Sequence, residues 1–374
     1  MPLRFLIPQQ ICRCEMAIFR RSNLLLKLGV TMLILNANEV RQSLPMKEAI
    51  AAMKDAYASL SDGTAVAPLR TRIPIPSRNA ISLFMPAYMK SDSAEALAVK
   101  VVSLYPSNPA RGLAYIQAAV LVLDSETGRA LALLEGSTLT AIRTGAGSGA
   151  AIDLLARKDS KVAAIFGAGP QGKTQLSAAC SARNIETVYI YNPARITPPL
   201  GSERDNPTMT KAEAFAKEMA GLDSIPKDIR VAKTPKEAIE YADIICTATG
   251  STTPVFEDKD VKSGTHISAI GAYTPEMQEL PIETVVRSRI VVDSRATVMD
   301  EAGDIVKAMK AGLITEANIH AELGEIVLGR KTGRQSEDEI TFFKSVGNAV
   351  QDAVAAQLAL KNAIKMKLGT EVDF

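Results

Sequence analysis

The stretch KVAAIFGAGPQGKTQL, Lys161 to Leu176, decides the fold of this chain. Residues 162–166 form a short apolar run, which is typical of a buried parallel strand. Gly167, Gly169 and Gly172 follow as G-x-G-x-x-G, and a helical stretch comes next. This strand–turn–helix order is the context that the dinucleotide-binding fingerprint requires. We therefore expect a nicotinamide dinucleotide site here, and not a Gly-rich turn without a ligand.

The chain after Lys161 alternates between strands and helices. Strands are predicted at 162–166, 187–191, 242–247, 265–270 and 289–293, and helices at about 172–183, 210–220 and 235–241. This alternation is typical of a doubly wound α/β sheet. A Pro-rich, charged insertion at 196–210 is expected to be a surface loop.

The chain before Lys161 has a different pattern. A helix is predicted at 43–61, with Ser43 as its cap and Pro45 in its first turn. Strands are predicted at 81–88, 95–105, 114–124 and 129–135. Because no helices separate these strands, we expect an antiparallel or mixed sheet.

Two further helices are predicted around the doubly wound part. The first spans 136–157, with Ser137 as a candidate cap, and its small residues at 145–151 indicate close approach of another backbone or a ligand. The second lies near the C-terminus, where a helical stripe collects several apolar side chains: Phe343, Val346, Val350, Val354 and Leu358. We expect the second helix to pack back against the first part of the chain.

These patterns predict an α/β protein with a split organisation. Residues 151–317 are the expected Rossmann dinucleotide-binding domain, and 32–150 with 318–374 the expected α+β substrate and dimerisation domain. Residues 1–31 are basic and lack a clear period. Three explanations stay open for them: a non-native leader with Met32 as the true start, a disordered or loosely packed arm, and an Arg-rich targeting segment.

Composition narrows the function classes. The net charge is +2, aromatic residues make up 5% of the chain, and Trp is absent, so nothing favours a nucleic-acid partner. No apolar run is long enough for a membrane span. Among the cysteines, Cys180 and Cys246 lie in apolar contexts, and Cys12 with Cys14 lacks the partners of a metal set. We expect no metal and a reduced, cytoplasmic setting.

The two histidines, His266 and His320, stand apart in the sequence and have no obvious acidic or Cys neighbour. Acid–base chemistry is therefore expected from a Lys, a Tyr or a carboxylate.

From Met32 onward the chain resembles the ornithine cyclodeaminase/mu-crystallin family. The matching runs occur in order: APLRTRIP (67–74), FMPAY (84–88), AVKVV (98–102), LTAIRTGA (139–146), FGAGPQG (166–172), ADIICTATG (242–250), SAIGAYTPEMQEL (268–280), VVDS (291–294), EAGD (301–304) and KSVGNAVQD (344–352). The resemblance implies a homodimer with a split substrate domain and a Rossmann domain, acting on amino acids, imino acids or ketimines with NAD(P)(H).

The resemblance also implies roles for individual residues. Arg70, Lys100 and Arg143 would hold the substrate carboxylate, with Val346 beside the substrate. Arg143 would also reach the cofactor. The other cofactor residues that the resemblance implies are Pro170, Gln171, Thr247, Ala248, Ile270, Gly271 and Ser345. The sequence pattern itself adds the glycines Gly167, Gly169 and Gly172, and also Asn192 and Arg195, which follow the second Rossmann strand.

Two departures from the family pattern bear on the reaction. Tyr273 stands where ornithine cyclodeaminases carry a catalytic Asp, and Leu83 where they carry a Glu. The chain is therefore more similar to members that reduce cyclic imines, Δ1-pyrroline-2-carboxylate or Δ1-piperideine-2-carboxylate, and Leu83 and Phe84 suit such a ring. Ornithine cyclodeaminase, alanine dehydrogenase and an NADPH-dependent ligand-binding protein remain alternatives.

The sequence also suggests candidates for the proton donor and for the cofactor. Lys100 is the first candidate for the proton on the imine nitrogen, and Tyr273 the second. Asn192 ends the second Rossmann strand, where NAD sites usually have an acid. A neutral Asn tolerates a 2′-phosphate, so we expect NADPH to be preferred, with NADH possible.

Overall fold

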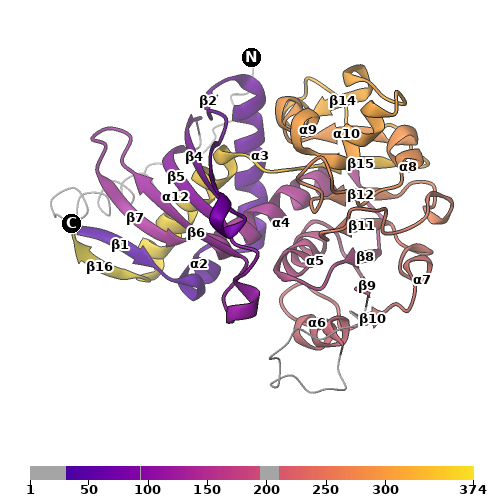
Figure 1. The fold of residues 1–374 in the computed structure, drawn as a ribbon, viewed down its shortest axis with the longest axis horizontal. Coiled ribbons are helices and arrows are strands. Elements are labelled where there is room, and N and C mark those ends of the chain that lie inside the picture. The colour runs from indigo at the N-terminus through magenta and orange to yellow at the C-terminus, as the bar shows by residue number, and fades with distance from the viewer. Residues whose placement is uncertain (1–30, 93, 194–209) are drawn as a thin grey trace, which may run out of the picture.

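The computed structural model describes residues 31–92, 94–193 and 210–374. Within these residues the chain forms two eight-stranded sheets, which lie in the two halves of the molecule in Figure 1. The first strand begins at Thr31, one residue before the expected start of the fold. The predictions for residues 1–30, including Cys12 and Cys14, and for 194–209, including Arg195, lie outside the described residues.

The first sheet is mixed, as expected. Its strands are β1 (Thr31–Leu35), β2 (Ala65–Val66), β3 (Thr71–Ile75), β4 (Ala80–Lys90), β5 (Glu95–Leu104), β6 (Ile116–Leu123), β7 (Ala130–Glu135) and β16 (Thr370–Asp373). Their order is β16-β1-β7-β6-β5-β4-β2, with β3 also on β4. β1 runs parallel to β7, while β4, β5, β6 and β7 pair antiparallel in succession.

The helices of the first part differ from the prediction in their division and in their caps. The expected helix 43–61 is two helices, α2 (Ala37–Ser43) and α3 (Met46–Asp62), so Ser43 ends one helix and does not cap the other. α4 (Gly136–Leu155) is capped by the Glu135 carboxylate, which accepts the backbone N–H groups of Ser137 and Thr138 at 2.8 Å. A carboxylate can accept both N–H groups at once, so Ser137 is not the cap. Short 3₁₀ helices lie at Pro76–Arg78 and Pro109–Arg111.

The second sheet is parallel throughout and doubly wound, which confirms the predicted fold class. Its strands are β8 (Val162–Phe166), β9 (Thr187–Tyr191), β10 (Ile229–Val231), β11 (Ile244–Thr247), β12 (His266–Ala269), β13 (Arg289–Val292), β14 (Ile319–Glu322) and β15 (Thr341–Lys344). Their order is β10-β9-β8-β11-β12-β15-β13-β14. The connecting helices are α5 (Pro170–Ala182), α6 (Lys211–Met219), α7 (Pro235–Ile239), α8 (Ile282–Arg287), α9 (Arg295–Glu301), α10 (Gly303–Lys310) and α11 (Leu323–Val327), with 3₁₀ helices at Asp258–Asp260 and Glu316–Asn318.

The predicted C-terminal stripe is wrong at its start. Phe343 belongs to β15, a central strand whose four residues are all buried, and α12 (Ala349–Met366) begins only after it. A short apolar run buried on both faces cannot be told from a helix by its period. The expected boundary at 317/318 is also wrong, because β14 and β15 belong to the second sheet.

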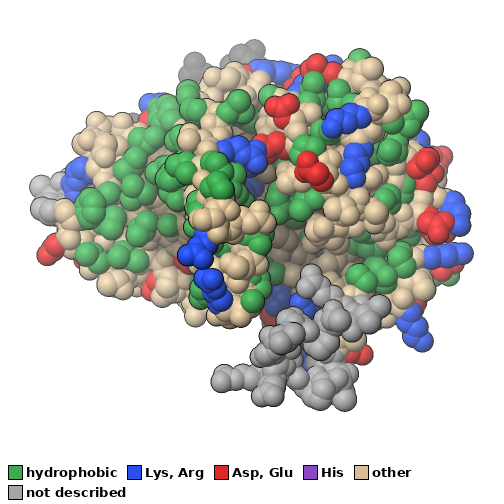
Figure 2. All heavy atoms as spheres, in the orientation of Figure 1, with side chains coloured by type: hydrophobic (Ala, Val, Ile, Leu, Met, Phe, Trp, Pro, Cys, Tyr) green, Lys and Arg blue, Asp and Glu red, His purple; other side chains and the backbone are tan. Residues whose placement is uncertain are grey.

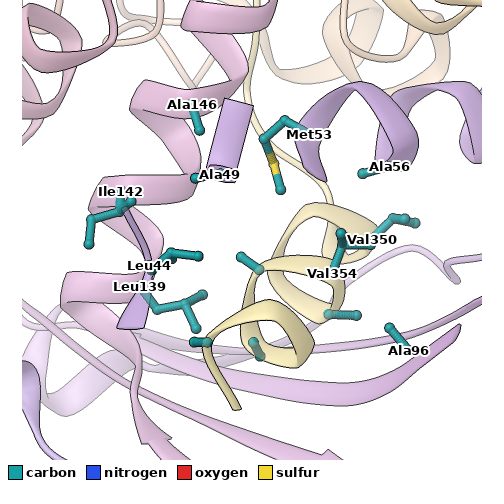
Figure 3. Packing of buried hydrophobic residues seen from close by; sticks show 14 of the residues in the cluster. Leu44, Ala49, Met53, Ala56, Ala96, Leu139, Ile142, Ala146, Val350 and Val354 are labelled. Carbon is teal, nitrogen blue, oxygen red and sulfur yellow. The ribbon is translucent and has the colours of Figure 1, made fainter. Parts of the chain in front are cut away.

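α12 returns to the first part of the chain, as predicted. It contacts β4, β5, β6 and α3, and in Figure 3 its Val350 and Val354 lie near Met53, Ala56 and Ala96. The helix thus fills the space between α3 and the first sheet. Burial of this apolar face is the main source of its stability.

α4 connects the two halves. A Cβ atom on Gly145 would lie 2.5 Å from the carbonyl oxygen of Thr174 in α5, so only a glycine admits this contact. The close backbone approach predicted from the small residues of α4 is therefore confirmed. None of the helices in the described ranges has both the length and the apolar character that a bilayer crossing needs.

Candidate active site

The turn between β8 and α5 has the geometry of a dinucleotide site. Gly167 has a φ of +106°, and a Cβ on Gly172 would lie 1.9 Å from the Gly167 carbonyl oxygen. The space beside Gly169 is open, with no atom within 4 Å of a Cβ built there. α5 begins at Pro170 without a side-chain cap, so its first N–H groups are available to an anion. The residues present therefore fit a pyrophosphate.

Two more residues at this turn bear on the cofactor. Gln171 has a buried Oε1 atom without a hydrogen-bond partner among the described residues. Asn192, just after β9, accepts the backbone N–H of Ala168 through Oδ1 at 3.1 Å. The neutral amide is thus fixed against the Gly-rich turn.

The ends of β11 and β12 lie side by side. Thr247 pairs with Ala269, and the backbone N–H of Ile270 donates to the Thr247 carbonyl oxygen at 3.0 Å. The backbone N–H of Ala248 donates to the Phe166 carbonyl at the end of β8. Thr247, Ala248, Ile270 and Gly271 are thus together at the carboxyl edge of the sheet, where ligands bind in doubly wound folds.

Lys100 and Arg143 share one buried carboxylate. Lys100 Nζ lies 2.6 Å from Asp352 Oδ2, and Arg143 Nε donates to Asp352 Oδ1 at 2.9 Å. Their side chains are 2%, 7% and 1% exposed for Lys100, Arg143 and Asp352, so water screens these charges little. The three come from β5, α4 and the first turn of α12. Two cations on one acid leave a net positive charge for an anionic ligand.

Arg70 reaches the same place from the loop before β3. Its guanidinium donates to the Gly347 carbonyl oxygen at 2.8 Å and lies 3.4 Å from Glu301. Gly347 packs on Arg143, because a Cβ there would lie 2.5 Å from a guanidinium nitrogen. The turn before α12 therefore brings Arg70, Lys100 and Arg143 together.

This turn is also attached to the second sheet. Asp293, after β13, accepts through Oδ2 from Ser345 Oγ at 2.7 Å, Gly347 N at 2.8 Å and Val346 N at 3.1 Å. Ser345 and Val346 directly follow β15. The cationic cluster thus adjoins the edge that carries the dinucleotide turn.

The two candidate proton donors differ in acidity. Burial lowers the pKa of Lys100 to about 8, although Asp352 opposes the shift, and Arg143 lowers it further. Burial raises the pKa of Tyr273 to about 12, and a hydrogen bond with Tyr115 adds to the shift. Near neutral pH Lys100 is the better acid of the two.

Leu83 and Phe84, the two residues expected to contact the substrate ring, lie on opposite faces of the first sheet. Leu83 is buried on β4, two residues from Met85, which pairs directly with Lys100. Because alternate strand residues share a face, Leu83 faces the same side as Lys100 and Phe84 faces the other side. The expectation that Phe84 also lines the ring is wrong for that reason.

Sequence reasoning missed the two acids that organise the cluster, Asp352 and Asp293. Each of them is 1% exposed. Asp352 stands with Gln351 at the start of a helix whose following residues, AVAA, are apolar, and an acid on such a helix is a weak sign of a buried partner. The partners themselves lie too far away in the chain to be predicted from spacing.

Comparison with known proteins finds relatives over most of this chain. A model of the ornithine cyclodeaminase/mu-crystallin family matches residues 30–367. A curated Δ1-pyrroline-2-carboxylate reductase of Bacillus cereus is 39% identical over 344 residues, covering 92% of this chain and 100% of the relative.

Two solved structures are similar in fold. The Δ1-pyrroline-2-carboxylate reductase of Thermococcus litoralis, in complex with NADH and L-proline, is 44% identical with a TM-score of 0.82, covering 91% of this chain and 100% of that one. An archaeal alanine dehydrogenase dimer with bound NAD is 32% identical with a TM-score of 0.79, covering 92% and 99%.

Proposed function

Because the chain belongs to the ornithine cyclodeaminase/mu-crystallin family, we propose that it reduces a cyclic imino acid with NAD(P)H. The substrate is Δ1-pyrroline-2-carboxylate or Δ1-piperideine-2-carboxylate, and the product is L-proline or L-pipecolate. The chain is thus an oxidoreductase that acts on a CH–NH bond. The observation that carries the proposal is the position of the buried cationic cluster beside the dinucleotide edge of the second sheet.

The cluster would bind the substrate through its carboxylate. Arg143 and Arg70 offer planar guanidinium groups suited to a carboxylate, and Lys100 adds a compact charge. Binding at three points fixes the orientation of a small ring. Leu83, on the same face as Lys100, supplies an apolar surface for the ring carbons.

The bound cofactor supplies the hydride, and the protein must supply a proton. An imine accepts hydride more readily when its nitrogen is protonated. We assign this proton to Lys100 Nζ, whose pKa of about 8 allows donation near neutral pH. Tyr273, with a pKa of about 12 and a hydroxyl held by Tyr115, is the weaker candidate.

The activity is tested by following NAD(P)H oxidation with three substrate sets, and ammonia release from ornithine as a fourth test. We expect turnover with pyrroline-2-carboxylate or piperideine-2-carboxylate, and little with pyruvate plus ammonia. Ornithine with NAD(P)⁺ should release no ammonia, because Leu83 and Tyr273 offer its side-chain ammonium no acid, and an unpaired buried ammonium is strongly disfavoured. Ammonia release at a rate comparable to imine reduction would support a cyclodeaminase instead.

The pH dependence tests the proton donor. The protonated form of Lys100 is the active one, so kcat/KM should be highest below its pKa and fall as the pH rises through about 8. The measurement is the pH profile of kcat/KM with the imine at low concentration. A profile that stays level to pH values near the Tyr273 pKa of about 12 would assign the proton to Tyr273.

Asn192 tests the cofactor preference. We expect NADPH to be preferred over NADH, and Asn192→Asp to reverse this preference. One oxygen of the Asp can still accept the Ala168 N–H, while the new negative charge repels a 2′-phosphate. The measurement is kcat/KM for each cofactor, with Asn192→Ala as the uncharged control. A wild-type preference for NADH of tenfold or more would contradict the prediction.

We also propose a cytoplasmic homodimer. On β5 the side chains of Val99 and Val101 point away from α12 and are only half-buried. Near the sheet edge Val66, Leu69 and Ile73 are 60%, 81% and 48% exposed, and Figure 2 shows hydrophobic side chains gathered over this half of the molecule. Such a surface favours binding of a second copy of the chain, and light scattering would test the dimer.

The cytoplasmic location rests on the cysteines. Cys180 and Cys246 are buried and free, which suits a reducing compartment.

A further inference from the structure

Glu279 is a fully buried acid that the reaction scheme above does not use. Its Oε1 accepts from Thr249 N at 2.6 Å and Thr249 Oγ1 at 2.8 Å. Its Oε2 accepts from Gly271 N at 2.7 Å and Thr247 Oγ1 at 2.9 Å. One carboxylate therefore holds the ends of both β11 and β12.

A buried ion pair, Asp304 with Lys344, holds the backbone of Glu279 in place. Asp304 Oδ1 accepts the backbone N–H of Glu279 at 2.7 Å and of Leu280 at 3.0 Å. Asp304 Oδ2 accepts from Lys344 Nζ at 2.9 Å, and both side chains are 0% exposed. Lys344 ends β15, so the network reaches a third neighbouring strand.

The network lies under one half of the dinucleotide site. In a doubly wound sheet the cofactor crosses the carboxyl ends of the strands from one mononucleotide unit to the other. The Gly-rich turn follows β8, so the ends of β11 and β12 belong to the nicotinamide half. A Cβ on Gly271 would lie 2.2 Å from Thr249 O and 2.4 Å from Glu279 Oε1, so these groups leave no room for a side chain.

The network has an excess of acid. Two carboxylates share one lysine, and each Glu279 oxygen accepts a backbone N–H, which suits the ionised form. Burial raises the pKa of Glu279, while the Lys344 charge opposes this. A fixed negative charge attracts a cation more strongly in a buried site of low dielectric constant than it does in water. The oxidised nicotinamide ring is cationic, and the reduced ring is neutral.

We propose that Glu279 is a positioning residue. It fixes Thr249 and Gly271 at the ends of β11 and β12, where the nicotinamide ring would bind, and we call this place the nicotinamide seat. The negative charge of Glu279 also favours binding of the oxidised cofactor. This inference rests on the NAD(P)H dependence proposed above but not on the identity of the imine. Stabilising the oxidised form makes the bound reduced cofactor a better hydride donor. Glu279 touches neither solvent nor substrate, so it acts through Thr249 and Gly271.

The test compares the dissociation constants of the oxidised and reduced cofactor, without any imine. Glu279→Gln keeps the size of the side chain and removes its charge. We expect the ratio of Kd for NAD(P)⁺ to Kd for NAD(P)H to rise about fivefold or more. The reduced cofactor is titrated by its own fluorescence and the oxidised form by competition. A ratio within about twofold of wild type would overturn the proposal.

Asp243→Asn is the matched control. Asp243 is also a buried acid of the same sheet, but it accepts Lys161 N at 2.8 Å and Val162 N at 3.0 Å at the amino ends of the strands. Its loss should reduce stability and leave the Kd ratio unchanged. An equal change in ratio for Asp243→Asn would show a general structural effect and overturn the proposal.

A second variant covers the case in which Glu279→Gln does not fold. Thr249→Val removes the hydroxyl that Oε1 accepts at 2.8 Å and keeps every charge. We expect both cofactor forms to bind about threefold or more weakly, with their ratio unchanged. Wild-type affinities in folded Thr249→Val would overturn the proposed seat. A wild-type protein that binds both cofactor forms but reduces neither imine would count against the proposed substrate and not against the role of Glu279.

Discussion

Lys100→Ala and Arg143→Ala should each reduce kcat/KM for imine reduction by about 30-fold to several thousand-fold, while NAD(P)H binding stays largely intact. This range corresponds to about 2–5 kcal/mol for the loss of a charged partner in a closed site. Each variant still leaves Asp352 one cation, Arg143 or Lys100. The fold should therefore survive, and the loss should be in substrate binding and turnover.

Lys90→Ala is the matched control for these variants. Lys90 ends β4 in the same sheet, but its side chain is 66% exposed and pairs with Glu95 at 3.6 Å. Its removal should leave kcat/KM near wild type, because surface ion pairs contribute little. Near-normal kcat/KM in both Lys100→Ala and Arg143→Ala would rule out the carboxylate clamp.

Asp352→Asn should have the largest effect on stability. It leaves Lys100 and Arg143 buried without their shared acid, which costs about 3–5 kcal/mol in comparable buried pairs. Since Asp352 raises the pKa of Lys100 against the effect of burial, the alkaline fall of kcat/KM should also move to lower pH. Denaturant unfolding measures the first effect, and the pH profile the second.

The control for this variant is Asp228→Asn. Asp228 pairs with Arg230 at 2.7 Å, but its side chain is 42% exposed, so its loss should change stability by about 1 kcal/mol or less. If Asp352→Asn unfolds like Asp228→Asn and keeps the wild-type pH profile, Asp352 does not hold the two cations.

Some site residues could be predicted from a local sequence pattern, and others only through the family resemblance. Gly167, Gly169 and Gly172 follow from a local pattern, because strand, turn and helix are consecutive. Arg70, Lys100 and Arg143 were expected only through the family resemblance, since an isolated cation in an apolar strand or helix is equally compatible with a solvated charge. The structure adds the acid that joins Lys100 to Arg143, and the contact of Arg70 with Gly347.

Position along the chain explains what was missed. Arg143 and Asp352 are 209 residues apart, and no local period relates them. The buried position of Glu279 could not be predicted either, because the four groups that donate hydrogen bonds to it lie at the ends of two strands, β11 and β12.

The sequence by itself determined the Gly-rich turn and strands β8, β9, β11, β12 and β13 of the doubly wound half, because periodicity, strand length and turn residues are properties of neighbouring residues. It also determined the apolar strands β4 to β7 and the close approach of α4 to another backbone. Only the tertiary structure decided that TFFK is a central strand and that Phe84 faces away from Lys100. Those outcomes depend on burial between distant segments, where the contacts made after folding override the local pattern.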